Sequence, residues 1–283
     1  MEPTFDFRIK IAEVPARVKC RCGETAEFLR PYMDLAPEGE PLAAAPDAGT
    51  PGARQEDEAP AAAPDAPLFT VEPGEQDLLR MREELIRTTE KEGHPQTHFS
   101  RAYLEQNAVH ALLAEQLARR GVLLMHGSAL CMDGQGYIFT AKSGTGKSTH
   151  ARLWREVFGD RVWMINDDKP MLRVGPDGVT VWGTPWDGKH HLSRNAGAPL
   201  SAIVQIRRAP ENRLKPMSKA EAFPLLMQQT YASADPATGL QILSLQRQIL
   251  EKVRFYTMEC NMEKEAAEVA WEGMKQADQP EKE

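Results

Sequence analysis

The sequence has no hydrophobic run long enough to cross a membrane. None of its apolar stretches approaches the roughly 18 consecutive apolar residues that a transmembrane helix needs. Residues 1–6 also lack the basic start and apolar run of a secretory signal. We therefore expect a cytoplasmic protein that has no membrane partner.

Cysteine is scarce, with 4 residues in a chain of 283. A disulfide framework needs more cysteines than this at such a length. Cys20 and Cys22 are one residue closer together than the pair of a zinc knuckle, and the sequence has no second pair to complete four ligands. We expect free thiols at both positions.

Basic residues are in the minority. Lys and Arg number 34 against 41 Asp and Glu, which gives a net charge of -7. Residues 36–67 account for most of this excess, because they hold seven acidic residues and one basic residue. A surface that binds nucleic acid needs a basic excess, so the composition predicts no nucleic-acid partner.

Residues 36–67 also stand apart by their eleven Ala and seven Pro. Proline blocks helix continuation and alanine offers little surface to pack, so this segment is predicted to be an acidic, flexible linker or loop. It separates a small N-terminal β segment, residues 1–35, from a main α/β domain at 68–275. A polar tail at 276–283 follows that domain.

Hydrophobic patterns in the rest of the chain alternate between strand and helix spacing. Ser100 is a suitable N-cap for a helix that Gly121 ends, and Ser218 with Glu221 has the spacing of a capping box for a helix through Gln229. Further helices are predicted at 147–158, 240–253 and 264–274. Strands are predicted at 4–11, 16–20, 122–125, 129–132, 137–140, 162–165, 202–206 and 255–260, with a hairpin at 171–182. The expected fold class is α/β with a mixed sheet and a small N-terminal strand-rich piece.

The strongest motif lies directly between a predicted strand and a predicted helix. It consists of Ser143, Gly144, Thr145, Gly146, Lys147, Ser148 and Thr149. In such a loop the backbone N–H groups turn towards phosphate oxygens, the lysine reaches the terminal phosphates and the Ser148 hydroxyl ligates Mg²⁺. Ala141 stands at the first glycine position of the usual pattern, so we expect it to keep a negative φ. The motif predicts a Walker A P-loop that binds ATP with Mg²⁺.

Two carboxylates, Asp167 and Asp168, follow the next predicted strand. The carboxyl ends of strands in an open α/β sheet face one crevice, so we expect this pair beside the P-loop. Neighbouring carboxylates can hold a metal and accept a proton from an attacking hydroxyl. The alternative is a polar turn after a strand. His126 ends another apolar run, where a histidine by itself is more often structural than catalytic.

Taken in order, His126-Gly127, the P-loop and Asp167-Asp168 resemble the HPr kinase/phosphorylase family. They also resemble the wider group that shares its phosphoenolpyruvate-carboxykinase-like nucleotide fold. The matching motifs lie within residues 120–210. Segments 183–189 and 193–195 look more like an uncharacterised branch related to HPr kinase than like HPr kinase itself. The resemblance implies a P-loop kinase domain of that fold type.

The resemblance also implies roles for single residues. Asp168 would be the general base, and Lys147 would contact the transferring phosphate. Asp167 and Ser148 would hold the metal, and His126 would lie near the phosphate on the acceptor side.

Two parts of the family pattern are not found. In place of the Glu-x-Arg-Gly motif, whose Glu helps to hold metal, Asp187 is the candidate ligand. The late catalytic arginine has no counterpart in the sequence, and Arg194 and Lys189 are the candidates because they lie near by in the chain. These departures argue against protein HPr as the acceptor.

Two aromatic residues near the motifs have plainer interpretations beside functional ones. His150 follows the P-loop and is expected to cover the helix start. Trp186 is a candidate wall of the acceptor pocket, with core packing as the alternative.

The function predicted from the sequence is a Mg²⁺-dependent kinase that transfers the γ-phosphoryl group of ATP to a hydroxyl. The acceptor is a small molecule or a Ser/Thr of a peptide or protein. Pyrophosphate or another nucleotide stays open as the donor, and so does a homo-oligomeric state. The first alternative is a non-catalytic, nucleotide-sensing regulatory protein. A carboxykinase acting on oxaloacetate is a second alternative, for which the chain is short and lacks the Lys/His metal set.

Overall fold

The structure is a computed structural model that describes residues 4–34, 69–91, 93–142, 144–188 and 190–276. The predicted linker at 36–67 lies outside these ranges, as does the predicted polar tail apart from its first residue. In the described part of the chain, no helix combines the length and the hydropathy that a membrane span requires.

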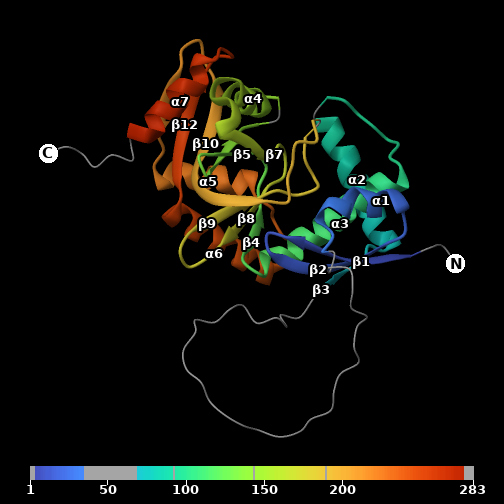
Figure 1. Ribbon diagram of the computed structural model, residues 1–283. Coiled ribbons are helices and arrows are strands. Elements are labelled where there is room, and N and C mark those ends of the chain that lie inside the picture. The colour runs from blue at the N-terminus through green and yellow to red at the C-terminus, as the bar shows by residue number, and fades with distance from the viewer. Residues whose placement is uncertain (1–3, 35–68, 92, 143, 189, 277–283) are drawn as a thin grey trace, which may run out of the picture.

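The body of the protein is one mixed sheet with helices on both faces (Figure 1). Within the described residues this sheet has nine strands, and seven of them follow in the order β4-β8-β9-β10-β6-β5-β7. The remaining two extend it from β10, because β12 pairs with β10 and β11 pairs with β12. The strands are β4 (Val122–Leu124), β5 (Ser128–Met132), β6 (Gln135–Thr140), β7 (Val162–Asn166), β8 (Met171–Val174), β9 (Val179–Trp182), β10 (Gly197–Arg208), β11 (Arg213–Pro216) and β12 (Arg254–Cys260).

Strand β10 joins the two halves of this sheet. Its first three residues, 197–199, pair antiparallel with β9. From Leu200 it runs parallel to β6, with a register shift between Leu200 and Ala202, and from Ala202 it also runs parallel to β12. Strand β5 is antiparallel to β6 and to β7. Strands β6, β7, β10 and β12 therefore point the same way, and their carboxyl ends meet at one edge of the sheet.

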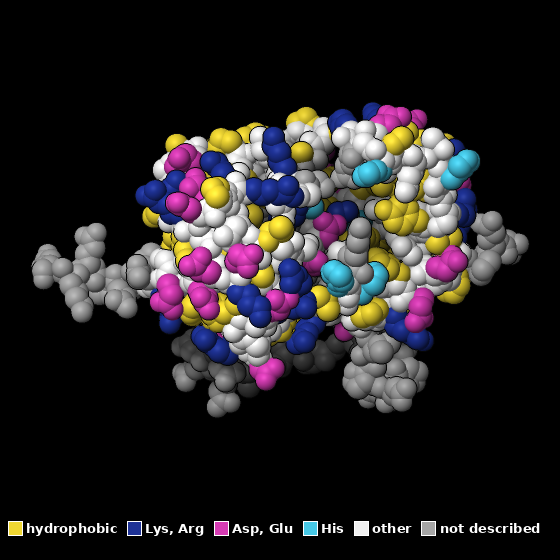
Figure 2. All heavy atoms as spheres, turned by 90° about the horizontal axis from the view of Figure 1, so that it is seen from above, with side chains coloured by type: hydrophobic (Ala, Val, Ile, Leu, Met, Phe, Trp, Pro, Cys, Tyr) yellow, Lys and Arg dark blue, Asp and Glu magenta, His cyan; other side chains and the backbone are white. Residues whose placement is uncertain are grey.

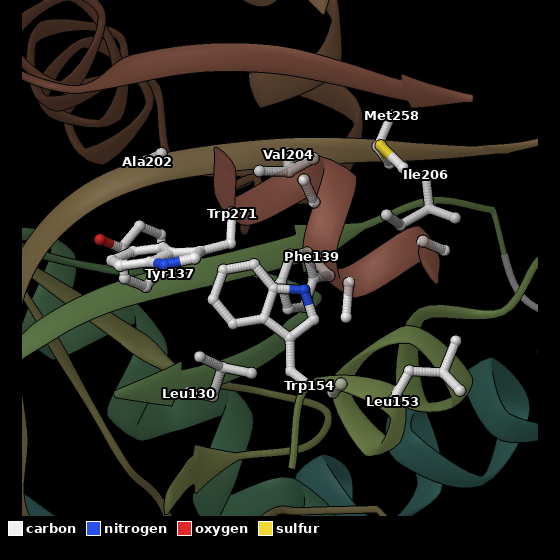
Figure 3. Packing of buried hydrophobic residues seen from close by; sticks show 14 of the residues in the cluster. Leu130, Tyr137, Phe139, Leu153, Trp154, Ala202, Val204, Ile206, Met258 and Trp271 are labelled. Atoms are coloured by element: carbon white, nitrogen blue, oxygen red, sulfur yellow. The ribbon is translucent and has the colours of Figure 1, made fainter. Parts of the chain in front are cut away.

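Helices cover the two faces of the sheet with separate hydrophobic cores. The first core packs α4 and α7 against the sheet, and Figure 3 shows Trp154 of α4 and Trp271 of α7 beside Tyr137 and Phe139 of β6. The second core places α5 and α6 on the opposite face. The helices of the body are α4 (Lys147–Phe158), α5 (Lys219–Gln229), α6 (Pro236–Lys252) and α7 (Glu265–Gln276), with a short 3-10 turn, η2 (Gly159–Arg161).

The N-terminal elements form a smaller unit against the body, on the right of Figure 1. Strands β1 and β2 form an antiparallel hairpin, and β3, from beyond the undescribed segment, pairs parallel with β2. A third core joins this sheet to α3 through residues such as Ile9, Ile11 and Leu113. The elements are β1 (Phe5–Ile11), β2 (Val14–Cys20), α1 (Gly23–Leu29), η1 (Arg30–Tyr32), β3 (Phe69–Val71), α2 (Glu75–Lys91) and α3 (Arg101–Ala118).

The mixed α/β class and most predicted elements of the body are confirmed. The Ser100 hydroxyl caps α3 by accepting from the Tyr103 N–H at 3.1 Å, and Ser218 with Glu221 forms the predicted capping box. Two boundaries were wrong: α6 begins at Pro236 rather than at 240, and β10 begins at Gly197 rather than at 202. Asp235 is the N-cap of α6 and Pro236 occupies its first turn, which is a start signal independent of apolar spacing.

Helices α1 and α2 were not predicted. In α2, a helix of 17 residues, Leu78 and Met81 are the buried side chains. Leu78, Met81 and Leu85 nevertheless recur at helical spacing, so the sequence carries the apolar stripe of an amphipathic helix that the sequence analysis did not assign.

Candidate active site

The P-loop bridges the end of β6 and the start of α4, as predicted. Gly144 and Gly146 have φ of 74° and 125°, in the region that favours glycine. Ala141 is not among the residues with positive φ, which agrees with the expectation for it. The loop ends on the first turn of α4, where helix N–H groups attract anions. Ser143 lies outside the described residues.

Arg208, at the end of β10, holds the loop from outside. Its Nη2 donates to the Gly144 carbonyl at 2.5 Å and its Nε donates to the Thr145 carbonyl at 3.1 Å. A planar guanidinium that makes two hydrogen bonds fixes both distance and direction. Arg208 therefore sets the path of the loop. The sequence analysis missed this residue, because nothing in the local pattern distinguishes it from neighbouring Arg207.

Lys147 is buried at the start of α4, and its Nζ donates to the Ala141 carbonyl at 3.3 Å. The ammonium group therefore lies over the loop, and its charge also acts on Asp168. Ser148, the next residue, lines a cavity of about 370 Å³ together with Asp167. The structure thus brings the phosphate loop and the predicted carboxylate pair together.

Asn166 holds the turn on which the two carboxylates lie. Its Oδ1 accepts the backbone N–H groups of Asp168 at 2.9 Å and Lys169 at 2.6 Å. Its Nδ2 donates to the carbonyls of Thr184 at 3.0 Å and Trp186 at 3.3 Å. This buried amide therefore ties the end of β7 to the loop that follows β9.

The two carboxylates have different surroundings. Asp167 is buried, and its Oδ1 accepts the Ser128 hydroxyl at 2.7 Å. Asp168 is partly exposed, and its Oδ1 lies 3.1 Å from Nδ1 of His126. Figure 2 views the molecule from above relative to Figure 1 and shows a hollow near its middle, in which acidic, basic and histidine side chains come together. The pair therefore separates into one buried and one accessible carboxylate.

Positive neighbours keep Asp168 ionised. Burial acts to raise the pKa of Asp168, but the hydrogen bond from His126 and the charges of Lys169, His126 and Lys147 outweigh it. The pKa of Asp168 therefore lies below its ordinary value. At neutral pH this carboxylate accepts hydrogen bonds.

The residues near Ser148 fit Mg²⁺ as a partner of bound phosphates. A hydroxyl and a carboxylate offer the hard oxygen ligands that Mg²⁺ prefers, and this ion usually keeps several waters and phosphate oxygens as its other ligands. Among the described residues, no group of three or more His, Cys, Asp or Glu side chains could hold a metal ion by itself. The site therefore suits a metal that arrives with a nucleotide.

Asp187 makes its hydrogen bonds within its own loop. Its side chain is 3% exposed, and its carboxylate accepts the Ser193 N–H at 3.1 Å and lies 3.1 Å from Nδ1 of His191. The next residue, Gly188, packs against Asp167, because a Cβ on Gly188 would lie 2.8 Å from Oδ2 of Asp167. Asp187 therefore shapes the loop around Asp167, and its role as a metal ligand stays a prediction.

Arg194 is not brought into the site. Its guanidinium lies 5.3 Å from the ring centre of Trp163, and Trp163 packs on the core that α5 and α6 cover. Met164, the next residue of β7, lines the cavity of Ser148 on the other face. Lys189, the other candidate for the role of the late catalytic arginine, lies outside the described residues.

His150 and Trp186 are both core residues. His150 packs edge-on to Phe139 and accepts the Trp154 indole N–H at 3.1 Å, and burial lowers its pKa to about 4. Trp186 donates its indole N–H to the Gln106 carbonyl at 3.1 Å and lies 4.5 Å, centre to centre, from His110. Trp186 thereby anchors the loop of Asp187 to α3.

His110 is a buried residue near the carboxylates that the sequence analysis missed. Burial lowers its pKa, the charge of Lys169 lowers it further, and Asp168 opposes both. Its ring packs against Trp186, and burial keeps it neutral. Its one signal in the sequence is a polar residue within the apolar stripe of a helix, which is a weak one.

A second cavity, of about 360 Å³, adjoins the P-loop on its other side. Its lining comes from the loop, from α4 and from the carboxyl ends of β10 and β12: Gly144, Thr145, Gly146, Thr149, His150, Leu153, Ile206, Arg208, Ala209, Cys260, Asn261 and Met262. Ligands of α/β sheets bind in the crevice at such strand ends. Met262 at this cavity is 75% exposed. Its flexible apolar side chain is therefore accessible to a ligand.

Comparison with known proteins adds little to this geometry. No family model and no curated protein matches the chain. Among solved structures, the HPr(Ser) kinase/phosphatase from Coxiella burnetii matches with a TM-score of 0.31 and 9% sequence identity, over 55% of this chain and 99% of that chain. A TM-score this low carries no argument, so the residues of the site must carry the functional conclusion.

Proposed function

We propose that this protein is a Mg²⁺-dependent kinase that transfers the γ-phosphoryl group of ATP to a hydroxyl group. The observation that carries the proposal is the placement of an ionised carboxylate, Asp168, within electrostatic reach of the P-loop lysine, Lys147. A protein that only binds nucleotide needs the loop but has no use for an accessible carboxylate beside it.

ATP fits the loop and the cavity next to it. The phosphates would lie along residues 144–147, at the start of α4, where backbone N–H groups and Lys147 neutralise their charge. The nucleoside would occupy the cavity of about 360 Å³, whose apolar walls include Leu153 and Ile206. Pyrophosphate would leave that cavity unfilled, which favours a nucleotide as donor.

Phosphoryl transfer needs positioning and charge stabilisation more than covalent chemistry. In the proposed step, the acceptor oxygen forms a bond to the γ-phosphorus as the bond from that phosphorus to the β–γ bridging oxygen breaks, and ADP leaves. The hydroxyl proton passes to a carboxylate oxygen of Asp168 and from there to solvent. Mg²⁺, when bound at Ser148 and Asp167, supplies positive charge to the phosphate oxygens.

The lowered pKa of Asp168 is compatible with this role. In a loose transition state the acceptor hydroxyl keeps its proton until late, so the carboxylate mainly orients the hydroxyl by accepting its hydrogen bond. His126 supports Asp168 by the contact of 3.1 Å, which fixes Oδ1. The other oxygen, Oδ2, lies 4.0 Å from Lys169 Nζ and would accept the hydrogen bond of the acceptor hydroxyl. His126 is thus a positioning residue in this proposal.

The proposal is tested by incubating the protein with γ-labelled ATP, Mg²⁺, pooled hydroxyl metabolites and Ser/Thr peptides. We expect labelled product with the wild type and none with Asp168→Asn. Asp160→Asn is the matched control, because Asp160 is an exposed carboxylate outside both cavities. Tight ATP binding in all three proteins without any labelled product would instead favour the nucleotide-sensing regulatory protein.

A further inference from the structure

The cavity that contains Ser148 extends along one face of α4. Ser148, Arg152 and Arg155 are four and three residues apart, which places them on the same side of the helix. Met164 and Asp167, at the end of β7, form the opposite wall. His190 and Leu192, from the loop after β9, close the end. One continuous space therefore runs from the proposed metal ligands to two arginines.

Arg155 differs from the other arginines near this cavity. Arg152 pairs with Glu156, and Arg161 pairs with Asp133. Arg155 is half-buried, and its guanidinium makes no ion pair or hydrogen bond with any described residue. A guanidinium that is partly removed from water without a partner loses hydration and gains nothing within the protein. Such a group is suited to binding an anion.

Helix geometry directs Arg155 towards the reacting end of the cavity. Arg155 is seven residues after Ser148, which is about 10 Å along the helix axis. Side chains of a helix lean towards its N-terminus, so the arginine reaches back along α4 towards Ser148. A small molecule can span the remaining distance between the phosphate loop and the guanidinium.

The charges in the cavity favour an anionic ligand. Its lining carries Arg152 and Arg155 against one carboxylate, Asp167. Arg152 is paired with Glu156, so once bound Mg²⁺ neutralised Asp167, Arg155 would remain as the excess positive charge. The cavity volume of about 370 Å³ lies within the range of small-molecule sites. A guanidinium fork matches the two oxygens of a carboxylate or phosphate.

We propose that the phosphoryl acceptor is a small hydroxyl compound with a carboxylate or phosphate group, and that Arg155 binds this anionic group. The inference rests on the proposed kinase function. It chooses between the two acceptor classes that the sequence leaves open, and it assigns to Arg155 a specificity role that no motif indicates.

Three probes with the same carbon chain test the inference: glycerol, glycerate and glycerol 1-phosphate. Transfer from γ-labelled ATP is measured for each. In the wild type we expect kcat/KM to be at least about tenfold higher for the anionic probes than for glycerol, mainly through a lower KM. A preference for glycerate over glycerol 1-phosphate, or the reverse, distinguishes the two anions.

Variants of Arg155 assign the preference to this residue. Arg155→Ala should reduce the ratio of kcat/KM between anionic and neutral probes by about 10- to 100-fold. Arg155→Lys should retain part of the ratio, because it keeps the charge and loses the fork. Arg247→Ala is the matched control, since Arg247 is an exposed arginine on α6 that pairs with Glu251. An unchanged ratio in Arg155→Ala would overturn the inference.

The outcomes separate this inference from the proposed function. Transfer to glycerol at least as efficient as transfer to the anions would retain the kinase and overturn the anionic acceptor. If ATP binds but no probe is phosphorylated, the binding of inorganic sulfate is measured by calorimetry with Mg²⁺ and a non-hydrolysable ATP analogue present. Sulfate should then bind at least about tenfold more weakly to Arg155→Ala than to the wild type, and equal affinity would contradict the inference. A protein that binds neither ATP nor its analogue would refute both proposals.

Discussion

Ser128 and Asp167 form a buried hydrogen bond of 2.7 Å between the serine hydroxyl and Oδ1 of the carboxylate. The serine begins β5 and the aspartate follows β7, so the bond links neighbouring strands at the edge where the P-loop lies. It occupies one oxygen of Asp167 and thereby fixes the direction of the other. In the proposed enzyme this orientation presents the carboxylate to a metal ion beside Ser148.

Ser128→Ala should therefore weaken the response to Mg²⁺. The variant loses a hydrogen bond to a charged group and leaves Asp167 free to rotate, so we expect the Mg²⁺ concentration for half-maximal transfer to rise about tenfold or more. Mg²⁺ titration of the transfer rate measures this. Ser201→Ala, which removes a hydroxyl that binds Arg254 instead, should leave the titration unchanged. Equal titration curves for Ser128→Ala and the wild type would show that Asp167 needs no such support.

Gly188→Ala should impair the same carboxylate from the opposite side. The new Cβ would lie 2.8 Å from Oδ2 of Asp167, so the loop or the carboxylate must move. We expect transfer to fall at least about tenfold, as a small misplacement at a reacting site can cost more. Gly178→Ala is the matched control, because nothing lies within 4 Å of its Cβ position. Full activity of Gly188→Ala at wild-type Mg²⁺ would contradict the placement of Asp167 at the metal.

Arg208→Ala should loosen the P-loop. The variant loses both hydrogen bonds to the loop carbonyls, so we expect ATP affinity to fall about tenfold while the fold is retained. Arg207→Ala provides the comparison, because Arg207 contacts Gln205 and lies outside the nucleotide cavity. Calorimetric titration with ATP distinguishes the two variants, and equal losses would mean that general surface charge is responsible.

His150 should make the fold sensitive to acid. Burial lowers its pKa from 6.5 to about 4, so as pH falls below 6.5 the unfolded chain takes up a proton before the folded one does. This group should therefore cost about 3 kcal/mol of stability between pH 6.5 and pH 4. Urea unfolding at several pH values measures it. His150→Leu should show a flatter dependence on pH, and parallel curves for the two proteins would exclude this cause.

The sequence was informative where chemistry lies next to a strand end. Lys147 and Asp168 each follow a short buried strand, so strand direction alone placed them at one edge of the sheet. Arg208 also lies at a strand end, but nothing in the sequence distinguishes it from Arg207, and His110 lies within a helix. Arg194 shows the converse. It is close to Asp187 in the sequence, but its guanidinium lies over Trp163, on the face of β7 opposite to Met164 and the cavity of Ser148.

Two further misses in the fold have different causes. Helix α2 carries apolar residues at helical spacing, among them Leu78, Met81 and Leu85, which the sequence analysis did not assign to a helix. Strand β11 is short and pairs with one neighbour, β12, so none of its four residues is buried and they show no alternation to recognise.

The central claim is that the P-loop binds ATP and that Asp168 acts in the transfer step. One paired experiment tests it directly. Calorimetric titration with Mg²⁺ and ATP is combined with γ-phosphoryl transfer for the wild type, Lys147→Ala and Asp168→Asn. We expect Lys147→Ala to lose ATP affinity, and Asp168→Asn to bind ATP within about threefold of the wild type while transfer falls by at least about 100-fold. Transfer that survives in Asp168→Asn, or ATP binding that disappears with it, would contradict the account.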